Sequence, residues 1–136
     1  ILTGPEEVEA ATFERVPLWN DKRDERGPFD IIGDIHGCAR ALDRLLEQLA
    51  PMPDDHLIFV GDYIDRGPDS KGVIERLLTL RETHRCTFLR GNHERLMLDY
   101  LDYGEYDLWH VNGGSTTLAS FASSTGSATT RKAGGR

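Results

Sequence analysis

Three short glycine-flanked segments hold most of the side chains in this 136-residue sequence that could do chemistry. They read GDIHG at 33–37, GDYIDRG at 61–67 and RGNHE at 90–94. Each places a carboxylate, amide or imidazole group next to a glycine. Oxygen and nitrogen ligands without thiolate favour Mn, Fe, Zn or similar ions over a structural zinc site. The pattern predicts a hydrolytic site that holds two metal ions.

The metal ligands can be assigned from residue type and spacing. Asp34 and His36 are one residue apart, so in an extended loop their side chains point the same way and can bind one ion. Asp62 has two carboxylate oxygens that can bridge two ions, and Asn92 offers a neutral oxygen. We therefore predict these four residues as metal ligands.

The other polar residues of the segments suit chemistry on phosphorus. Arg66 and Arg90 carry guanidinium groups, which match phosphate oxygens in a bidentate fork as Lys cannot. Asp65 can orient His93 and leave that imidazole as the general acid for the leaving oxygen. Two ions about 3.5–4 Å apart can activate a water and bind both oxygens of an in-line displacement. We predict His93 and Asp65 as catalytic residues, and Arg66 and Arg90 as phosphate-binding residues.

Short apolar runs and amphipathic stretches alternate around the three segments. The strand candidates are Phe29–Ile32, Leu57–Val60 and Cys86–Leu89. The helix candidates are Ala39–Leu49, a helix from Asp69 or Ser70 to about Leu80, and Glu94–Leu101. This repetition predicts an α/β fold of βαβ units, with parallel strands flanked by helices. Ligands collect beyond the carboxyl ends of such strands, so the three segments are expected to converge.

The rest of the chain has weaker patterns. Residues 1–28 are polar and broken by proline, which indicates a linker or surface arm. Residues 29–121 form the expected domain, although 109–114 read as a turn-like segment with Trp109 as a packing anchor. Residues 122–136 are rich in Ser, Thr, Gly and Ala, which indicates a flexible, low-complexity tail.

Composition narrows the classes of partner. The formal net charge of −7 argues against broad nonspecific nucleic-acid binding. The two cysteines are not in a CxxC pair, which favours a reduced, cytoplasmic setting. No apolar run approaches the length of a membrane span, so no membrane partner is expected.

The ordered set GDIHG, GDYIDRG and RGNHE resembles the calcineurin-like metallophosphoesterases, and within them the phosphoprotein phosphatase branch. Within that branch the sequence most resembles the bacterial serine/threonine protein phosphatases and their relatives, which include diadenosine tetraphosphate hydrolases. The resemblance implies a two-layered β-sandwich with a dinuclear site at strand ends. It implies that Asp34, His36 and Asp62 hold the first ion and that Asp62 and Asn92 hold the second. Mn is the most expected metal, with Fe, Zn and Ni as alternatives.

The sequence departs from this family in its later part. Family members complete the second metal site with two downstream histidines, but only His110 follows His93 here, and it stands beside Trp109. A later phosphate-binding arginine and the strands of the second sheet also lack counterparts. We therefore expect about the N-terminal half of such a domain and an incomplete second metal site. An apolar sheet face left uncovered could pair with another chain.

Three functions remain open from the sequence. The leading one is a metal-dependent phosphomonoesterase of the serine/threonine protein phosphatase type, acting on a phosphorylated protein or nucleotide. Residues 15–21 and 27–30 resemble the lead-in of bacterial polynucleotide kinase-phosphatases, which makes an RNA end-healing phosphatase the second candidate, alongside a dinucleoside tetraphosphate hydrolase. Arg90 and Glu94 favour the protein phosphatase type, because the repair enzymes usually have Asp after the His. The third is a truncated, non-catalytic fragment that binds a metal or a partner.

Overall fold

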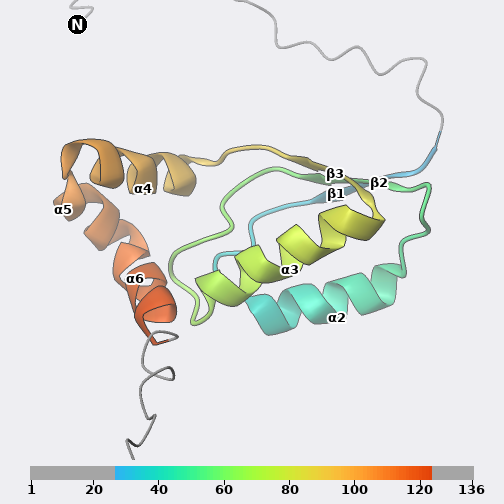
Figure 1. Cartoon of the computed structure of the whole chain (residues 1–136), viewed down its shortest axis with the longest axis horizontal. Coiled ribbons are helices and arrows are strands. Elements are labelled where there is room, and N and C mark those ends of the chain that lie inside the picture. The colour runs from blue at the N-terminus through green and yellow to red at the C-terminus, as the bar shows by residue number, and fades with distance from the viewer. Residues whose placement is uncertain (1–26, 124–136) are drawn as a thin grey trace, which may run out of the picture.

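The computed structural model describes residues 27–123, shown in colour in Figure 1. Residues 1–26 of the predicted arm at 1–28, including the lead-in at 15–21, lie outside the described residues. The same holds for 124–136 of the tail predicted at 122–136, whereas Ala122 is the last residue of a helix and not part of a flexible tail.

The described residues form a three-stranded parallel sheet with helices on one face and at one end. The strands are β1 (Phe29–Ile32), β2 (His56–Phe59) and β3 (Arg85–Phe88). The helices are α2 (Ala39–Leu49), α3 (Ser70–Thr83), α4 (Asn92–Tyr103), α5 (Tyr106–Trp109), η1 (His110–Gly114) and α6 (Ser115–Ala122). The strand order is β1-β2-β3, and Phe59 at the end of β2 lies opposite Ile32 and Phe88. This arrangement confirms the predicted α/β fold with parallel strands flanked by helices.

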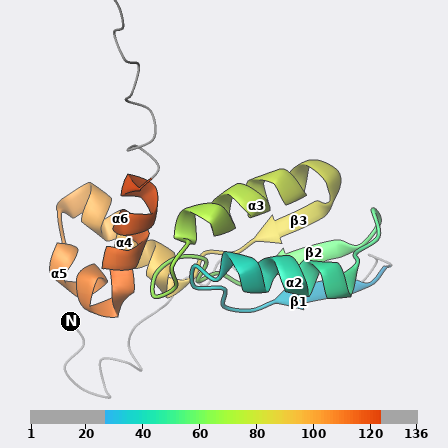
Figure 2. The same cartoon turned by 90° about the horizontal axis from the view of Figure 1, so that it is seen from below.

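The core lies between the sheet and the two crossover helices. Figure 2 shows α2 and α3 side by side on the same face of the sheet. Leu57 and Phe59 of the central strand point to that face and are fully buried, together with Val73 of α3. Burying a side chain of this size contributes about 1.5–3 kcal/mol. The helices α4, α5 and α6 gather beyond the carboxyl ends of the strands (Figures 1 and 2).

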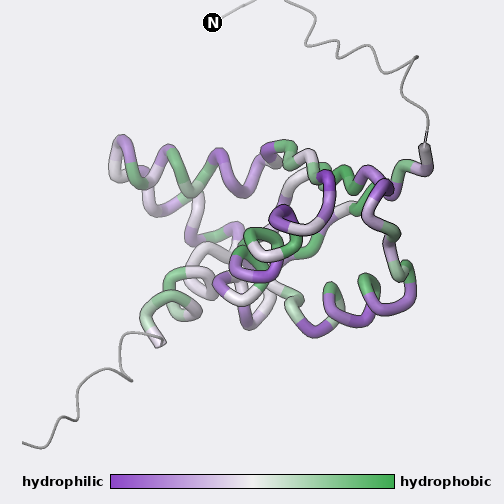
Figure 3. The backbone as a smooth tube through the Cα atoms, turned by 45° about the vertical axis from the view of Figure 1, so that its right-hand side comes forward, coloured by the Kyte–Doolittle hydropathy of each residue, from purple (hydrophilic) through white to green (hydrophobic). Residues whose placement is uncertain are grey.

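Local sequence explains the crossover helices well. Hydrophobic and hydrophilic residues alternate along α2 (Figure 3), and the helix ends at Leu49 as predicted, with Ala50 in a left-handed conformation. Asp69 is the cap of α3, because its carboxylate accepts the Gly72 N–H at 2.8 Å. The predicted bounds of β2, β3, α3 and α4 differ from the structure by one to three residues.

The turn predicted at 109–114 is wrong, because this segment is helical. Helix α5 continues through the π-helical turn η1 into α6, which also contains the apolar residues 118–121. Gly113, with φ of 100°, produces a kink between the two helices. Gly114 packs so closely on the Trp109 ring that a Cβ there would overlap it. The glycine pair that suggested a turn therefore bends a helix around a buried aromatic ring.

No helix covers the second face of the sheet in the part of the chain that the structure describes (Figure 1). Side chains alternate between the faces of a strand. Ile31, Val60 and Leu89 are on the open face and are 69%, 40% and 49% exposed.

None of the helices between residues 27 and 123 has the length and apolar character needed to cross a membrane.

Candidate metal and phosphate site

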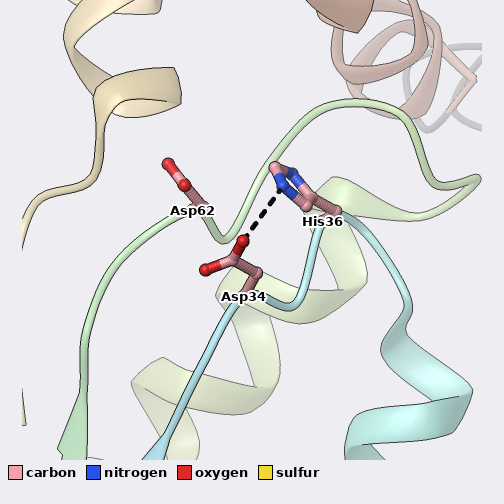
Figure 4. A group of neighbouring side chains, drawn as sticks. All are labelled: Asp34, His36 and Asp62. Carbon is pink, nitrogen blue, oxygen red and sulfur yellow. Dashed lines mark ion pairs between the residues drawn. The ribbon is translucent and has the colours of Figure 1, made fainter.

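Loops after β1 and β2 bring three of the predicted metal ligands together. Asp34, His36 and Asp62 each offer one ligand atom, and these atoms lie within 4.8 Å of one another (Figure 4). His36 Nε2 lies 3.8 Å from Asp34 Oδ2. Two carboxylates and one imidazole form a donor set that suits a catalytic divalent ion, so the residues present fit the metal that the sequence suggests.

Backbone strain is concentrated at this cluster. His36 and Asp62 have φ values of 43° and 55°, and Asp65 and Arg66 have values of 72° and 67°. Between residues 27 and 123, only one other non-glycine residue, Ala50, has a positive φ. Such conformations cost about 1–3 kcal/mol each and persist where the surrounding structure holds them, often at functional sites. The carbonyl of Asp62 holds the two loops together, since it accepts the N–H groups of Ile35 and His36 at 3.0 and 2.9 Å.

The orientation of His36 is fixed by its second ring nitrogen. Nδ1 lies 2.9 Å from the carbonyl oxygen of Ile64. A carbonyl can only accept, so Nδ1 carries the hydrogen and Nε2 presents its lone pair on the side of Asp34. This kind of outer hydrogen bond orients histidines that bind metals.

Glu94 joins the second segment to the third. Its carboxylate accepts the N–H groups of Asp62 and Tyr63, both at 2.8 Å, and that of Gly91 at 2.9 Å. The sequence suggests at most a stabilising charge at the start of a helix. The spacing of Gly91 and Glu94 fits one half of a capping box, in which the Glu carboxylate accepts the N–H of the N-cap residue, and this could have predicted the Gly91 bond. The bonds to residues 62 and 63 cross between loops, and no local pattern indicates them.

Tyr63 belongs to the support of the site. Its hydroxyl donates to the carbonyl of Leu89 at 2.6 Å, and the residue is only 7% exposed. Burial, reinforced by the nearby carboxylates of Glu94 and Asp62, raises the pKa of Tyr63 to about 12. The phenol therefore stays neutral and keeps its hydrogen bond across the physiological range.

His93 and Asp65 form a buried pair beside the cluster. His93 Nδ1 lies 2.8 Å from Asp65 Oδ2, and the two residues are 2% and 0% exposed. The backbone N–H of His93 donates to Asp62 Oδ1 at 3.0 Å, and the ring of His93 stands edge-on to that of His36 at 4.6 Å. The pair therefore adjoins the three candidate metal ligands.

Two further residues contact this pair, and the sequence analysis did not predict either contact. The indole N–H of Trp109 donates to Asp65 Oδ2 at 2.8 Å, and the Thr117 hydroxyl donates to Oδ1 at 2.7 Å. Trp109 was expected only as a packing anchor, and Thr117 carried no signal. Both are more than 40 residues from Asp65 along the chain.

The remaining predicted site residues lie on the same loops. Asn92 is exposed at the first position of α4, directly before His93. Arg66 and Arg90 are exposed on the second and third segments, and neither guanidinium forms an ion pair with any residue from 27 to 123. His110 is exposed, contacts the Tyr106 hydroxyl at 2.9 Å and is not part of the cluster.

The fold and this cluster define a metallophosphoesterase type of site. The family model described as calcineurin-like phosphoesterase matches residues 27–135. The chain therefore belongs to the calcineurin-like phosphoesterase family.

Among curated proteins, the chain is similar to bacterial protein phosphatases. It is 46% identical over 85 residues to serine/threonine-protein phosphatase 1 of Salmonella typhimurium, covering 62% of this chain and 38% of that protein. It is 41% identical over 85 residues to serine/threonine-protein phosphatase 2 of Escherichia coli, covering 62% of this chain and 37% of that protein. The chain thus spans little more than a third of the length of these relatives.

Proposed function

We propose that this chain carries the N-terminal, metal-binding part of a phosphomonoesterase of the serine/threonine protein phosphatase type. One observation carries the proposal. The carboxylates of Asp34 and Asp62 and the imidazole of His36 converge beside the buried pair of His93 and Asp65. A metal site and a proton donor in this proximity are what hydrolysis of a phosphoester requires.

In this proposal Asp34, His36 and Asp62 hold one ion, and Asp62 with Asn92 contributes to a second. Manganese is the metal we propose among those that a donor set of oxygen and imidazole nitrogen without thiolate allows, which also include Fe and Zn. When bound, such ions lower the pKa of a water molecule and neutralise charge on the phosphate oxygens.

The other residues act on the phosphate and on the leaving group. Arg66 and Arg90 are proposed to donate to phosphate oxygens, for which their exposed guanidinium groups are suited, since neither forms an ion pair with residues 27–123. His93 donates its Nδ1–H to Asp65, which orients the ring. In its protonated form it gives the proton on Nε2 to the leaving oxygen.

Hydrolysis of 4-nitrophenyl phosphate tests the reaction class. We expect turnover that depends on Mn²⁺, is lost in Asp62→Asn and is retained in the control Asp54→Asn, which alters an exposed carboxylate before β2. The assay is done with the 136-residue chain and with a chain extended along the parent reading frame. An extended chain without activity would overturn the proposal. Activity confined to the extended chain would make the present chain a non-catalytic metal-binding fragment.

The substrate class is a separate proposal. We favour a phosphorylated protein because both relatives above are named as protein phosphatases. Turnover of a phosphoserine peptide is compared with that of an RNA 3′-phosphate end and of diadenosine tetraphosphate. Preference for either nucleotide substrate would contradict the protein phosphatase assignment.

The two free cysteines, Cys38 and Cys86, support a cytoplasmic setting.

A further inference from the structure

Helices α5 and α6, which follow the third motif, contribute side chains to a polar cluster around Asp65, the partner of His93. Asp65 is fully buried, and its two carboxyl oxygens accept four contacts. Oδ2 accepts from His93 Nδ1 and from Trp109 Nε1, both at 2.8 Å. Oδ1 accepts from the Thr117 hydroxyl at 2.7 Å and from the same indole N–H at 3.0 Å. The donors come from α4, α5 and α6, so three separate helices meet at this carboxylate.

The direction of each hydrogen bond follows from the chemistry of the groups. An indole nitrogen can only donate, so Trp109 requires acceptors on Asp65. Thr117 has one hydroxyl hydrogen, which it gives to Oδ1, so at 3.0 Å it accepts from the Ser70 hydroxyl. Thr117 also accepts the backbone N–H of Asp65 at 2.9 Å. Its hydroxyl thereby uses its hydrogen and both lone pairs, and it holds the backbone and the carboxylate of Asp65 together.

The bond to Asp65 determines which nitrogen of His93 carries the hydrogen, because an ionised carboxylate can only accept. Trp109 and Thr117 donate to the same carboxylate. The His93 hydrogen is then on Nδ1, and Nε2 makes no hydrogen bond with any described residue. Burial makes the arrangement demanding, because an unpaired carboxylate in the interior is costly.

We propose that Trp109 and Thr117 are positioning residues, which fix Asp65 as an acceptor and so hold His93 in the tautomer and orientation that leave Nε2 available for proton transfer. The inference rests on the function proposed above for His93. Neither residue belongs to the three motifs, and both lie on helices that follow them. The segment 106–122 is thereby part of the site.

The test compares Thr117→Val with Thr117→Ser in the full 136-residue chain. Valine keeps the shape and removes the hydroxyl, whereas serine keeps the hydroxyl. Trp109→Phe is a second variant, and Thr79→Val, on the exposed side of α3, is the control because its hydroxyl donates only within its own helix. The readout is the tautomer of His93 in the metal-free chain. It is measured from long-range nitrogen–proton correlations of the ring, assigned with His93→Gln, at a pH where imidazoles are neutral.

We expect the wild type, Thr117→Ser and Thr79→Val to carry the hydrogen on Nδ1. We expect Thr117→Val and Trp109→Phe to populate the Nε2–H form, because a carboxylate that has lost a donor is no longer held where it accepts the Nδ1–H of His93. In the hydrolysis assay, kcat should fall about ten-fold or more in these two variants with little change in KM, the effect of losing one hydrogen bond to a charged group. An unchanged tautomer in folded Thr117→Val would overturn the inference, even if that variant melts at a lower temperature.

Failure of this inference can be told from failure of the proposed function. A shifted tautomer in chains that hydrolyse nothing would keep the positioning role and remove the catalytic one. If the wild type is active and Thr117→Val has the same tautomer and the same kcat, the proposed function stands and the positioning role is removed. If Trp109→Phe does not fold, the comparison of valine with serine at position 117 still decides.

Discussion

Glu94 and Tyr63 support the candidate site without contributing a metal ligand. Glu94 accepts three backbone N–H groups that belong to two loops. Tyr63 also joins these two loops, because its hydroxyl donates to the carbonyl of Leu89, directly before the third segment. Charged acceptors and buried donors of this kind contribute about 1–3 kcal/mol each. The positions of the proposed metal ligands therefore depend on neighbouring residues that take no direct part in the proposed reaction.

Tyr63→Phe should lower the free energy of unfolding by about 1 kcal/mol and remove a pH dependence at high pH. The pKa of Tyr63 is about 12 in the folded chain, above the ordinary value of 10. Below pH 10 the phenol is neutral in both states, so its contribution to stability is constant. Between these pKa values the unfolded chain has lost the proton and the folded chain has kept it, so stability falls as pH rises.

Urea denaturation of the metal-free chain across this alkaline range measures the effect. The loss of stability above pH 10 should be smaller in Tyr63→Phe than in the wild type. Tyr103→Phe is the matched control, because Tyr103 is 73% exposed and should leave the profile unchanged. Equal alkaline losses in the wild type and Tyr63→Phe would contradict the prediction.

The helices and strands differ in how far local sequence determines them. Helix α2 was predicted with its observed bounds because its leucines repeat with helical spacing and prolines follow it. The segment 109–114 was predicted wrongly, because two adjacent glycines are typical of turns and the buried ring that they accommodate is a tertiary feature. The sequence predicted that Asp34, His36 and Asp62 would meet, since parallel strands align their carboxyl ends. The bonds from Trp109 and Thr117 to Asp65 depend on how α5 and α6 pack, which no local pattern encodes.

Close approach of the loops after β2 and β3 requires glycine at position 61. Gly61 has φ of 110°, and a Cβ there would overlap the backbone of Gly91. Gly104 at the end of α4 also has a positive φ, of 76°, but faces open space. Gly104→Ala should therefore cost only the backbone strain, about 1–2 kcal/mol. Gly61→Ala should cost at least about 1–3 kcal/mol more, because the loops must move apart.

Denaturation midpoints of the two alanine variants measure this difference. Both variants introduce the same methyl group at a glycine with positive φ, so the difference between them reports the contact with Gly91 together with the greater strain of alanine at φ of 110° than at 76°. We also expect Gly61→Ala to weaken binding of Mn²⁺, and Gly104→Ala to leave it unchanged. Equal destabilisation by the two substitutions would show that the loops have room at this point.

The described domain has one covered and one open sheet face. The open face carries Ile31, Val60 and Leu89, and the chain spans little more than a third of the relatives to which it is similar. Exposed apolar patches of this kind are typical of surfaces that another element or chain covers. Association of the chain through this face remains a prediction, which the concentration dependence of the sedimentation coefficient can measure.

The distribution of ligands over the whole chain predicts unequal metal sites. The first ion has the cluster of Asp34, His36 and Asp62. For the second, Asp62 and Asn92 are the proposed ligands, and His110, the one histidine after His93 in the sequence, contacts Tyr106 instead. We therefore expect a calorimetric titration with Mn²⁺ to show one binding event and a second that is much weaker or absent.

The variants make the assignment of that single event testable. Asp34→Asn should weaken it by at least about ten-fold, and the control Asp54→Asn should not change it. Two tight events in the wild-type chain would contradict the prediction and would require ligands outside the described cluster. A second event that appears only in a chain extended beyond residue 136 would assign the missing ligands to the extension. In that case the present chain holds one metal by itself, and the reaction depends on residues that complete the second site.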